Sequence, residues 1–483
     1  MKKILYASFE AYPFIKTGGL ADMMYGLPLE VSKDYDVKIV LPLHKKIKDV
    51  YFDKFTYLDS LIIDNNLKEK ANIYSYKYKK IEYLFIENDK YFNRYDIYGF
   101  DDDNLRYSFF CLALVKMLKI LNYYPDIIHS NDYHTALIPA ICKLKYKNDK
   151  KISKIKHIYS IHNLAYQGHY DKQILFDYLG FDSKYYFDGT LRFDDECNFM
   201  KIGIVTADII VTVSKTYAKE ILSEEYGQGL DMVLRYRKDD LYGIVNGVDK
   251  MMFNPNNDEY IKYKYNSHNF VKYKALNKKE LLSKLNLKDD GSLVIGVVSR
   301  LTYQKGFDLL IDAYKDILKN KVKLIILGSG ESKYEYGFKI MEKEFPDKVS
   351  YICAYDEKLA HEIYAGSDMF LMPSLFEPCG LGQLIAMRYG TLPMVRETGG
   401  LKETVEPYNE YLKKGNGFSF GPYNKKDLLI VFNYAYRQYM NNQKDFKMLI
   451  RNAMKYDSSF KKVGEEYVKL YSRVLDKKYV KKV

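Results

Sequence analysis

The chain has 483 residues, of which 47% are apolar and 29% charged, an ordinary globular composition that excludes wholesale disorder and suits two or three domains. No apolar run approaches the roughly 18 residues of a membrane span. The five scattered cysteines form neither a disulfide framework nor a paired-Cys zinc pattern. The net charge of +12 comes from lysines spread among acids, so we expect no nucleic-acid partner and no membrane partner.

Lysines at both ends of the chain have simple explanations. Lys2 and Lys3 precede an apolar stretch that mimics a signal peptide, but Glu10 interrupts this stretch and no small-residue cleavage site follows. The basic cluster at residues 476–483 is typical of a solvated tail. We therefore expect a cytoplasmic protein.

Short apolar runs bounded by turn residues predict buried strands in the first half of the chain. They cover residues 3–8, 37–41, 127–129, 157–161 and 209–213. Helical spacing of apolar residues fills part of the sequence between them, as at 107–121. Strands that alternate with helices indicate parallel β-α-β units, and strands covered on both faces should be apolar throughout, as these are.

The same alternation restarts after residue 290. The predicted strands cover residues 293–298, 323–328, 349–352, 369–372 and 392–395, and a helix is predicted over 307–318. The stretch 246–274 between the two halves is polar and rich in asparagine, which is typical of a linker or hinge. We predict an α/β protein with two doubly wound, Rossmann-like domains that face each other across a deep cleft, where strand ends bind ligands.

A pair of glycine turns marks corresponding places in the two halves. The run from Lys16 through Gly18 and Gly19 to Asp22 follows the first strand, and Thr398-Gly399-Gly400-Leu401 repeats its Thr-Gly-Gly-Leu core. Paired glycines let backbone N–H groups approach an anion at a helix start. A purely structural turn explains the first run equally well, but two such turns favour a shared role. No G-x-G-x-x-G or P-loop pattern occurs, which disfavours dinucleotide-binding and Walker-type sites.

Charged residues follow two strands of the second half. Arg300 and Lys305 lie between a strand and a helix, where two cations suit a diphosphate whose charge grows as it leaves. The alternative is a pair of solvated cations at a helix start, which the helix dipole disfavours. Glu377 is the carboxylate best placed at a strand end, and the nearby Cys379 suits apolar packing better than nucleophilic chemistry.

Polar residues also end two strands of the first half, at Asp132 and at His162-Asn163. A lone histidine is more often a satisfied structural residue than a catalytic one. Polar clusters at several strand ends shift that balance, because only a ligand-binding rim needs them. The eight histidines include no H-E-x-x-H pattern, and we predict no metal site.

Taken together, these motifs resemble bacterial glycogen synthase and plant starch synthase, the glycosyltransferase family 5 with its GT-B fold. The resemblance spans almost the whole chain. It is carried by residues 16–22, 131–134, 161–168, 229–231, 243–249, 299–301, 304–306 and the run from Pro373 to Leu401.

The resemblance implies a hexosyltransferase of glycogen biosynthesis that transfers glucose from ADP-glucose to the non-reducing end of an α-1,4-glucan. Configuration is retained, and neither a metal nor another cofactor is needed. A same-fold enzyme that uses UDP-glucose, and a catalytically silent glucan-binding relative, remain alternatives. The sequence leaves the oligomeric state open.

The family pattern also implies residue roles. Arg300 and Lys305 would clamp the diphosphate, Glu377 would face the glucose, and the backbone of His162 would lie near the anomeric centre. The residues implied to contact substrate are Lys16, Gly18 and Gly19 on the phosphate and acceptor side; Asp132, Asn163 and Asn246 at sugar hydroxyls; Tyr355 at the adenine; and Cys379, Gly380, Leu381, Thr398 and Gly399 as backbone donors.

The chain departs from the family pattern at few positions. Asn131 and Tyr133 replace a His and a Trp that are common in bacteria, and Ile385 stands where related families carry a second Glu. A double displacement between two carboxylates is therefore not supported, and front-face attack is expected. The implied domains are an acceptor domain at 1–245, a nucleotide-sugar domain at 246–460, and a final helix at 461–483 that crosses back onto the first domain.

Overall fold

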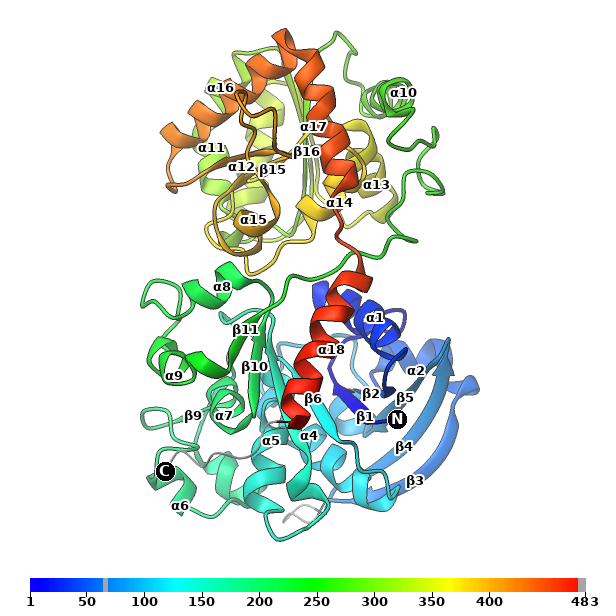
Figure 1. Cartoon of the computed structure of the whole chain (residues 1–483), viewed down its shortest axis with the longest axis vertical. Coiled ribbons are helices and arrows are strands. Elements are labelled where there is room, and N and C mark those ends of the chain that lie inside the picture. Colours follow the sequence, from blue (N-terminus) through cyan, green and yellow to red (C-terminus); the bar gives the residue numbers. More distant parts are fainter. Residues whose placement is uncertain (64–67, 477–483) are drawn as a thin grey trace. The chain divides into compact units, whose positions relative to one another are not determined.

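The computed structural model describes residues 1–63 and 68–476, and the chain divides into two compact units. Unit 1 comprises Met1–Gly247 and Phe460–Val483, and unit 2 comprises Val248–Ser459 (Figure 1). Each unit is built on a largely or wholly parallel sheet with helices, so the predicted α/β fold class is confirmed. Residues 477–483 of the predicted basic tail lie outside the described residues.

Unit 1 contains a nine-stranded sheet with the order β11-β10-β7-β6-β1-β2-β5-β4-β3. Its strands are β1 Lys3–Ala7, β2 Asp36–Pro42, β3 Thr56–Ile62, β4 Lys70–Tyr78, β5 Ile81–Glu87, β6 Ile127–Asn131, β7 Lys156–Ile161, β10 Ile209–Thr212 and β11 Leu241–Gly243. The strands from β11 to β5 pair in parallel, whereas β4 runs antiparallel to β5 and β3. The inner strands are buried along almost their whole length because helices cover both faces.

Helices surround this sheet, and the last helix of the chain is one of them. The helices of unit 1 include α1 Gly19–Val31, α2 Lys45–Tyr51, α4 Asp103–Ile120, α5 Leu137–Ala140, α7 Phe199–Thr206, α8 Lys215–Glu220, α9 Asp231–Tyr236 and α18 Phe460–Asp476. In Figure 1, α18 (red) lies beside α1 (blue), and the Phe460 ring fills the space that a side chain at Gly26 would need. The Tyr471 hydroxyl is 2.6 Å from the Tyr6 hydroxyl and 2.9 Å from His129 Nδ1, which fixes α18 to the centre of the sheet.

Unit 2 contains a six-stranded sheet with the order β14-β13-β12-β15-β16-β17, in which all neighbours are parallel. Its strands are β12 Leu293–Val298, β13 Val322–Leu327, β14 Val349–Ile352, β15 Met369–Met372, β16 Leu392–Arg396 and β17 Phe418–Phe420. Its helices include α10 Phe270–Lys284, α11 Phe307–Leu318, α12 Ser332–Glu344, α13 Glu357–Gly366, α14 Gly382–Arg388, α15 Gly399–Thr404, α16 Lys425–Asn441 and α17 Gln443–Lys455. Every strand and helix predicted for this half is present, and α11 has the predicted bounds.

The stretch 246–274, predicted to be a linker or hinge, is anchored by buried contacts. From Val248 onwards it packs on unit 2: Tyr265 is fully buried and donates to the Tyr389 carbonyl at 2.7 Å. The Asp258 carboxylate lies 2.8 Å from His361 Nδ1 and accepts from the Tyr389 hydroxyl at 2.5 Å. Asparagine is a turn former as well as a linker residue, which explains the misleading composition.

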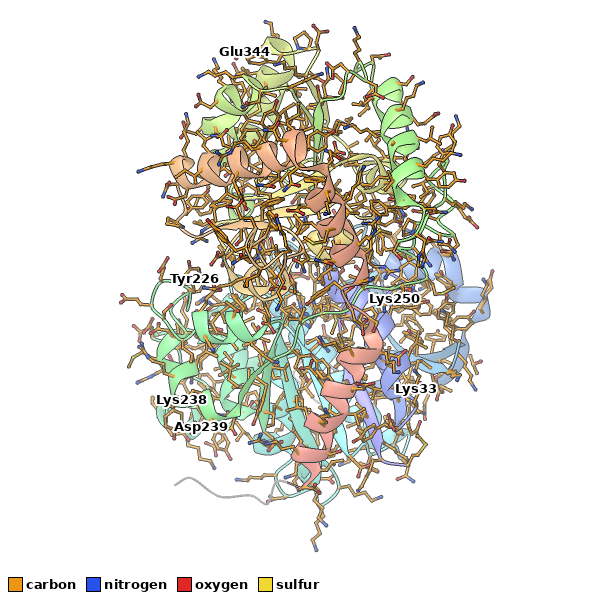
Figure 2. The ribbon with its side chains drawn as sticks, turned by 45° about the horizontal axis from the view of Figure 1, so that its top comes forward. Lys33, Tyr226, Lys238, Asp239, Lys250 and Glu344 are labelled. Atoms are coloured by element: carbon orange, nitrogen blue, oxygen red, sulfur yellow. The ribbon has the colours of Figure 1, made fainter. Side chains whose placement is uncertain are left out.

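Many charged side chains lie on the surface, although some, such as Arg106, are fully buried. Lys33, Lys238 and Glu344 are exposed on their units (Figure 2). Lys250, also labelled there, pairs with Asp457 at 2.8 Å. Within residues 1–63 and 68–476, none of the helices combines the length and the apolar character needed to cross a membrane.

Candidate functional site

In each unit the strand order reverses beside a central strand, and the predicted site residues follow the strands at that point. In unit 1 the chain runs outward from β1 through β2 and then returns to β6 on the other side of β1. In unit 2 it runs from β12 through β13 to β14 and then returns to β15 beside β12. Because the crevice at such a reversal is not covered by a connecting helix, open α/β sheets bind ligands there.

The loop after β1 carries the first glycine pair, and a buried carboxylate holds it. Glu10 is 4% exposed, and its Oε2 accepts from the backbone N–H groups of Thr17 at 2.5 Å and of Gly18 at 3.0 Å. Lys16 pairs with Asp22 on α1 at 2.7 Å. Open space surrounds the position that a side chain on Gly18 would occupy, so a ligand can approach the backbone there. The Gly18 N–H, predicted to face an anion, is bonded to Glu10 in this structure.

Asp132 and His162 meet at the carboxyl ends of β6 and β7. Asp132 Oδ1 accepts from the His162 backbone N–H at 2.8 Å, and His162 Nε2 lies 2.9 Å from Asn131 Oδ1. Because an amide oxygen only accepts, the imidazole carries its proton on Nε2. Asp132 has φ 55° and ψ 179°, a strained conformation that costs on the order of 1–3 kcal/mol and is common at functional sites.

Burial determines the protonation of both groups. It lowers the pKa of His162 to about 4, so the imidazole is neutral at pH 7. Burial also raises the pKa of Asp132 to about 7, against the backbone N–H groups of His162 and Asn163, which favour the ionised form. The site in unit 1 therefore holds a neutral imidazole beside a carboxyl group that titrates near physiological pH.

The predicted charged residues of unit 2 lie beyond the carboxyl ends of β12 and β15. Lys305 Nζ lies 2.9 and 2.7 Å from the two carboxylate oxygens of Glu377, which is 5% exposed. The Ser374 hydroxyl donates to the same carboxylate at 3.0 Å. Arg300 leaves β12 on the same side of the sheet, and its side chain is exposed. The structure thus brings Lys305 and Glu377 together as a salt bridge, which the sequence did not predict.

Glycines allow the loops around this salt bridge to pack closely. Gly306 has φ 68°, and a side chain there would collide with the Pro373 carbonyl. A side chain at Gly399, with φ 44°, would collide with the Glu377 carbonyl. The Gly400 N–H donates to that same carbonyl at 3.2 Å. The second glycine turn therefore braces the backbone of Glu377, besides any contact that it makes with a ligand.

The remaining predicted residues take these positions. Tyr355 follows β14 in unit 2 with its side chain 85% exposed, which leaves its ring free to stack on a planar group. Asn163 and Asn246 belong to unit 1, and Asn246 is 6% exposed. In unit 2, Cys379 and Thr398 are buried, and Gly380 and Leu381 lead into α14.

Sequence reasoning missed two residues that hold the site together. Glu10 was noted only as an interruption of an apolar run, and Ser374 was not singled out. Neither carries a motif of its own, because the hydrogen bonds of each depend on how its loop folds. A buried acid shortly after a strand, followed by paired glycines, is the signal that could have indicated Glu10.

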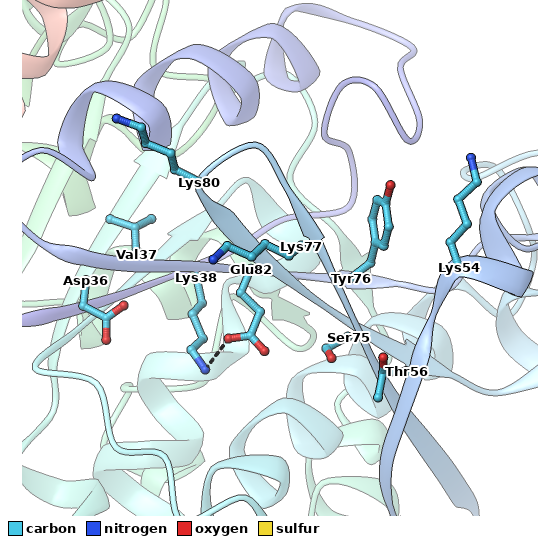
Figure 3. Close-up of a pocket in the computed structure, with 10 residues that line it drawn as sticks. All are labelled: Asp36, Val37, Lys38, Lys54, Thr56, Ser75, Tyr76, Lys77, Lys80 and Glu82. Atoms are coloured by element: carbon cyan, nitrogen blue, oxygen red, sulfur yellow. Dashed lines mark ion pairs between the residues drawn. The ribbon is translucent and has the colours of Figure 1, made fainter.

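A separate hollow lies at the end of the unit 1 sheet opposite to the carboxyl ends of its parallel strands. It has a volume of about 450 Å³ at the amino ends of β2 and β5, and Lys38 pairs there with Glu82 at 2.7 Å (Figure 3). Its lining contains none of the predicted site residues. Across residues 1–63 and 68–476, no three His, Cys, Asp or Glu side chains are grouped so that they could hold a metal ion.

Family models match both halves of the chain. The model described as "Starch synthase catalytic domain" matches residues 3–236, and "Glycosyl transferases group 1" matches residues 278–456.

Similar proteins share nearly the full length of the chain. A glycogen synthase of Clostridium beijerinckii is 45% identical over 97% of this chain and 98% of its own, and one of Clostridioides difficile is 41% identical over 98% and 100%. The catalytic domain of starch synthase IV from Arabidopsis thaliana, solved with ADP and acarbose, superimposes with a TM-score of 0.89 at 30% identity, covering 99% of both chains.

Proposed function

Because this chain belongs to the glycogen synthase family, we propose that it transfers glucose from ADP-glucose to the non-reducing end of an α-1,4-glucan, with retention of configuration. The observation that carries this proposal is the set of Arg300, Lys305 and Glu377 at the strand reversal of unit 2. Two cations beside a carboxylate suit a substrate with a negative diphosphate on one side and a developing positive charge on the other.

In the proposed reaction, Arg300 and Lys305 bind the diphosphate and stabilise the charge that grows on it. The bond between the glucose C1 and the diphosphate oxygen breaks, and ADP departs with the electron pair. The 4-hydroxyl of the glucan attacks C1 from the same face, and the departing diphosphate takes its proton. Glu377 stabilises the positive charge that develops on the sugar, and a single carboxylate fits front-face attack better than a covalent intermediate.

The salt bridge between Lys305 and Glu377 gives each residue a resting partner before the donor binds. An unpaired carboxylate with so little exposure would be costly, and Lys305 provides its partner and holds it in place. When the diphosphate arrives, it competes for the Lys305 ammonium. The position of Glu377 is then set by the Ser374 hydroxyl and by the Gly399 and Gly400 backbone.

In this proposal, unit 2 binds the nucleotide sugar and unit 1 binds the glucan. Tyr355 stacks on the adenine, and Cys379, Gly380, Leu381, Thr398 and Gly399 line the glucose and distal phosphate. In unit 1, the backbone of His162 faces the anomeric centre, Lys16, Gly18 and Gly19 line the phosphate and acceptor side, and Asp132, Asn163 and Asn246 bind sugar hydroxyls. The reaction needs no cofactor, since the two cations neutralise the leaving group.

A donor comparison tests the proposal. Purified protein is incubated with glycogen and labelled ADP-glucose or UDP-glucose at matched concentrations, and incorporation into glycogen is measured. We expect faster incorporation from ADP-glucose. An equal or reversed preference would refute the donor assignment, and no incorporation from either donor would favour a silent glucan-binding protein.

A further inference from the structure

We propose that Glu10 is the positioning residue of the glycine loop, residues 16–19: its carboxylate fixes the loop and thereby the place from which Lys16 acts on the substrate. This inference rests on the proposed glucosyl transfer and adds to it a residue that lies outside the motifs of the site. Glu10 would act through the loop and not by touching the reacting atoms.

The hydrogen bonds of the Glu10 carboxylate come from this loop and from the Tyr98 hydroxyl. Oε2 accepts from the backbone N–H groups of Thr17 at 2.5 Å and Gly18 at 3.0 Å. Oε1 accepts from the Thr17 hydroxyl at 2.6 Å and from the Tyr98 hydroxyl at 2.8 Å. With 4% exposure, Glu10 is shielded from water that could replace these bonds. Both oxygens therefore accept at least one hydrogen bond from the loop.

The start of α1 lacks a side-chain acceptor of its own. Helix α1 begins at Gly19, and its N-cap residue Gly18 has no side chain to accept the free N–H groups of the first turn. Glu10 supplies the acceptor for the Thr17 and Gly18 N–H groups that lead into the helix. The Ser8 hydroxyl donates to the Glu10 carbonyl at 2.8 Å, so the end of β1 sets the position of Glu10 itself.

The loop is thus held at both ends. Glu10 fixes Thr17 and Gly18, while Lys16 pairs with Asp22 one turn into α1. Loss of the carboxylate would free two adjacent N–H groups and let the loop turn, which would move the Lys16 ammonium. A displacement of about 1 Å at a group that positions substrate can cost on the order of 10²-fold in rate.

Two variants of Glu10 and one control test the proposal. Glu10→Ala removes every acceptor. Glu10→Gln keeps one carbonyl oxygen that can accept from the backbone N–H groups of Thr17 and Gly18. Its amide NH2 group then faces the hydroxyls of Thr17 and Tyr98, which can rotate and accept a hydrogen bond. The control is Asp208→Ala, at the amino end of β10 in unit 1. Asp208 is another largely buried carboxylate, and it accepts from the backbone N–H of His157 at 2.7 Å. Steady-state kinetics, thermal melting and amide hydrogen exchange are measured on the same preparations.

We expect Glu10→Ala to lower kcat/KM by on the order of 10²-fold in folded protein, and Glu10→Gln to restore it to within about threefold of the wild type. Amide exchange at Thr17 and Gly18 should speed up at least about tenfold in Glu10→Ala only, while Asp208→Ala should melt earlier with near-normal kinetics. Unchanged kinetics in folded Glu10→Ala, or a Glu10→Gln variant as impaired as Glu10→Ala, would overturn the proposal. If the wild-type protein transfers no glucose, the proposed function fails, whereas the exchange data still decide whether Glu10 holds the loop.

Discussion

Replacing Lys305 by Ala should damage both the stability of unit 2 and the chemistry. The change removes an ammonium that lies 2.7 and 2.9 Å from the oxygens of the buried Glu377 carboxylate. Breaking a buried ion pair by removing one partner costs about 3–5 kcal/mol. Here the Lys305 side chain is 19% exposed and Ser374 still donates to Glu377, so we expect about 2–3 kcal/mol. For a domain of roughly 150–250 residues this lowers the melting temperature by about 4–12 °C.

The kinetic effect should fall on kcat. Charge builds on the diphosphate as the glycosidic bond breaks, so the Lys305 cation binds the transition state better than the bound substrate. Loss of one such preorganised donor costs on the order of 10²–10³-fold in kcat. The assay is the initial rate of glucose incorporation over a range of ADP-glucose concentrations, with the melting temperature measured on the same protein.

A control and a double variant separate the two effects. Lys278 pairs with Asp368 at 2.6 Å at the amino end of β15, the strand that leads toward Glu377. Lys278→Ala should therefore lower the melting temperature with a near-normal kcat. In Lys305→Ala with Glu377→Gln, no charge is left unpaired, so stability should recover while activity stays low. Normal kcat in folded Lys305→Ala, or an equal loss of kcat in Lys278→Ala, would refute the assignment of Lys305 to the diphosphate.

Three further outcomes are expected. Activity should survive excess chelator because Arg300 and Lys305 supply the positive charge; loss on chelation with rescue by magnesium or manganese would contradict this. Burial raises the pKa of Asp132 from 3.8 to about 7, so the folded protein keeps a proton that the unfolded chain releases. The contribution of Asp132 to the free energy of unfolding is therefore full below about pH 4 and is lost as the pH rises through 7. The stability of the wild type relative to Asp132→Asn, measured by urea unfolding, should therefore be lower at pH 8 than at pH 5, and an equal difference at both would count against it. Gly306→Ala should cost at least about 1–2 kcal/mol because of its left-handed φ and the collision with the Pro373 carbonyl, and an unchanged melting temperature would be inconsistent with this packing.

The buried strands were predictable because their physics is local. Parallel strands covered on both faces are apolar along their length, so runs such as those at β1, β12 and β15 stand out without any knowledge of their neighbours. The antiparallel strands β3 and β4 were not predicted. β3 is largely exposed, so its sequence lacks the apolar run, and only pairing with β4 defines it.

The site was predictable as a set of residue types at strand ends, but its internal contacts were not. Motifs placed Lys305 and Glu377 after neighbouring strands, yet their salt bridge depends on the order of β12 and β15 in the sheet. The role of Glu10 depends on a loop folding back onto it. In the stretch 246–274, the polar composition predicts a linker or hinge and gives no sign of buried residues such as Tyr265.

Analysis of the transfer product tests the central claim most directly. The protein is incubated with ADP-glucose and a short α-1,4-linked maltooligosaccharide, and the product is examined by NMR for the position and configuration of the new linkage. We predict chains lengthened at the non-reducing end by α-1,4-linked glucose, with release of ADP. A β-linked product, a different linkage position, or hydrolysis of ADP-glucose without chain extension would contradict the assignment of Arg300, Lys305 and Glu377 to a retaining glucosyl transfer.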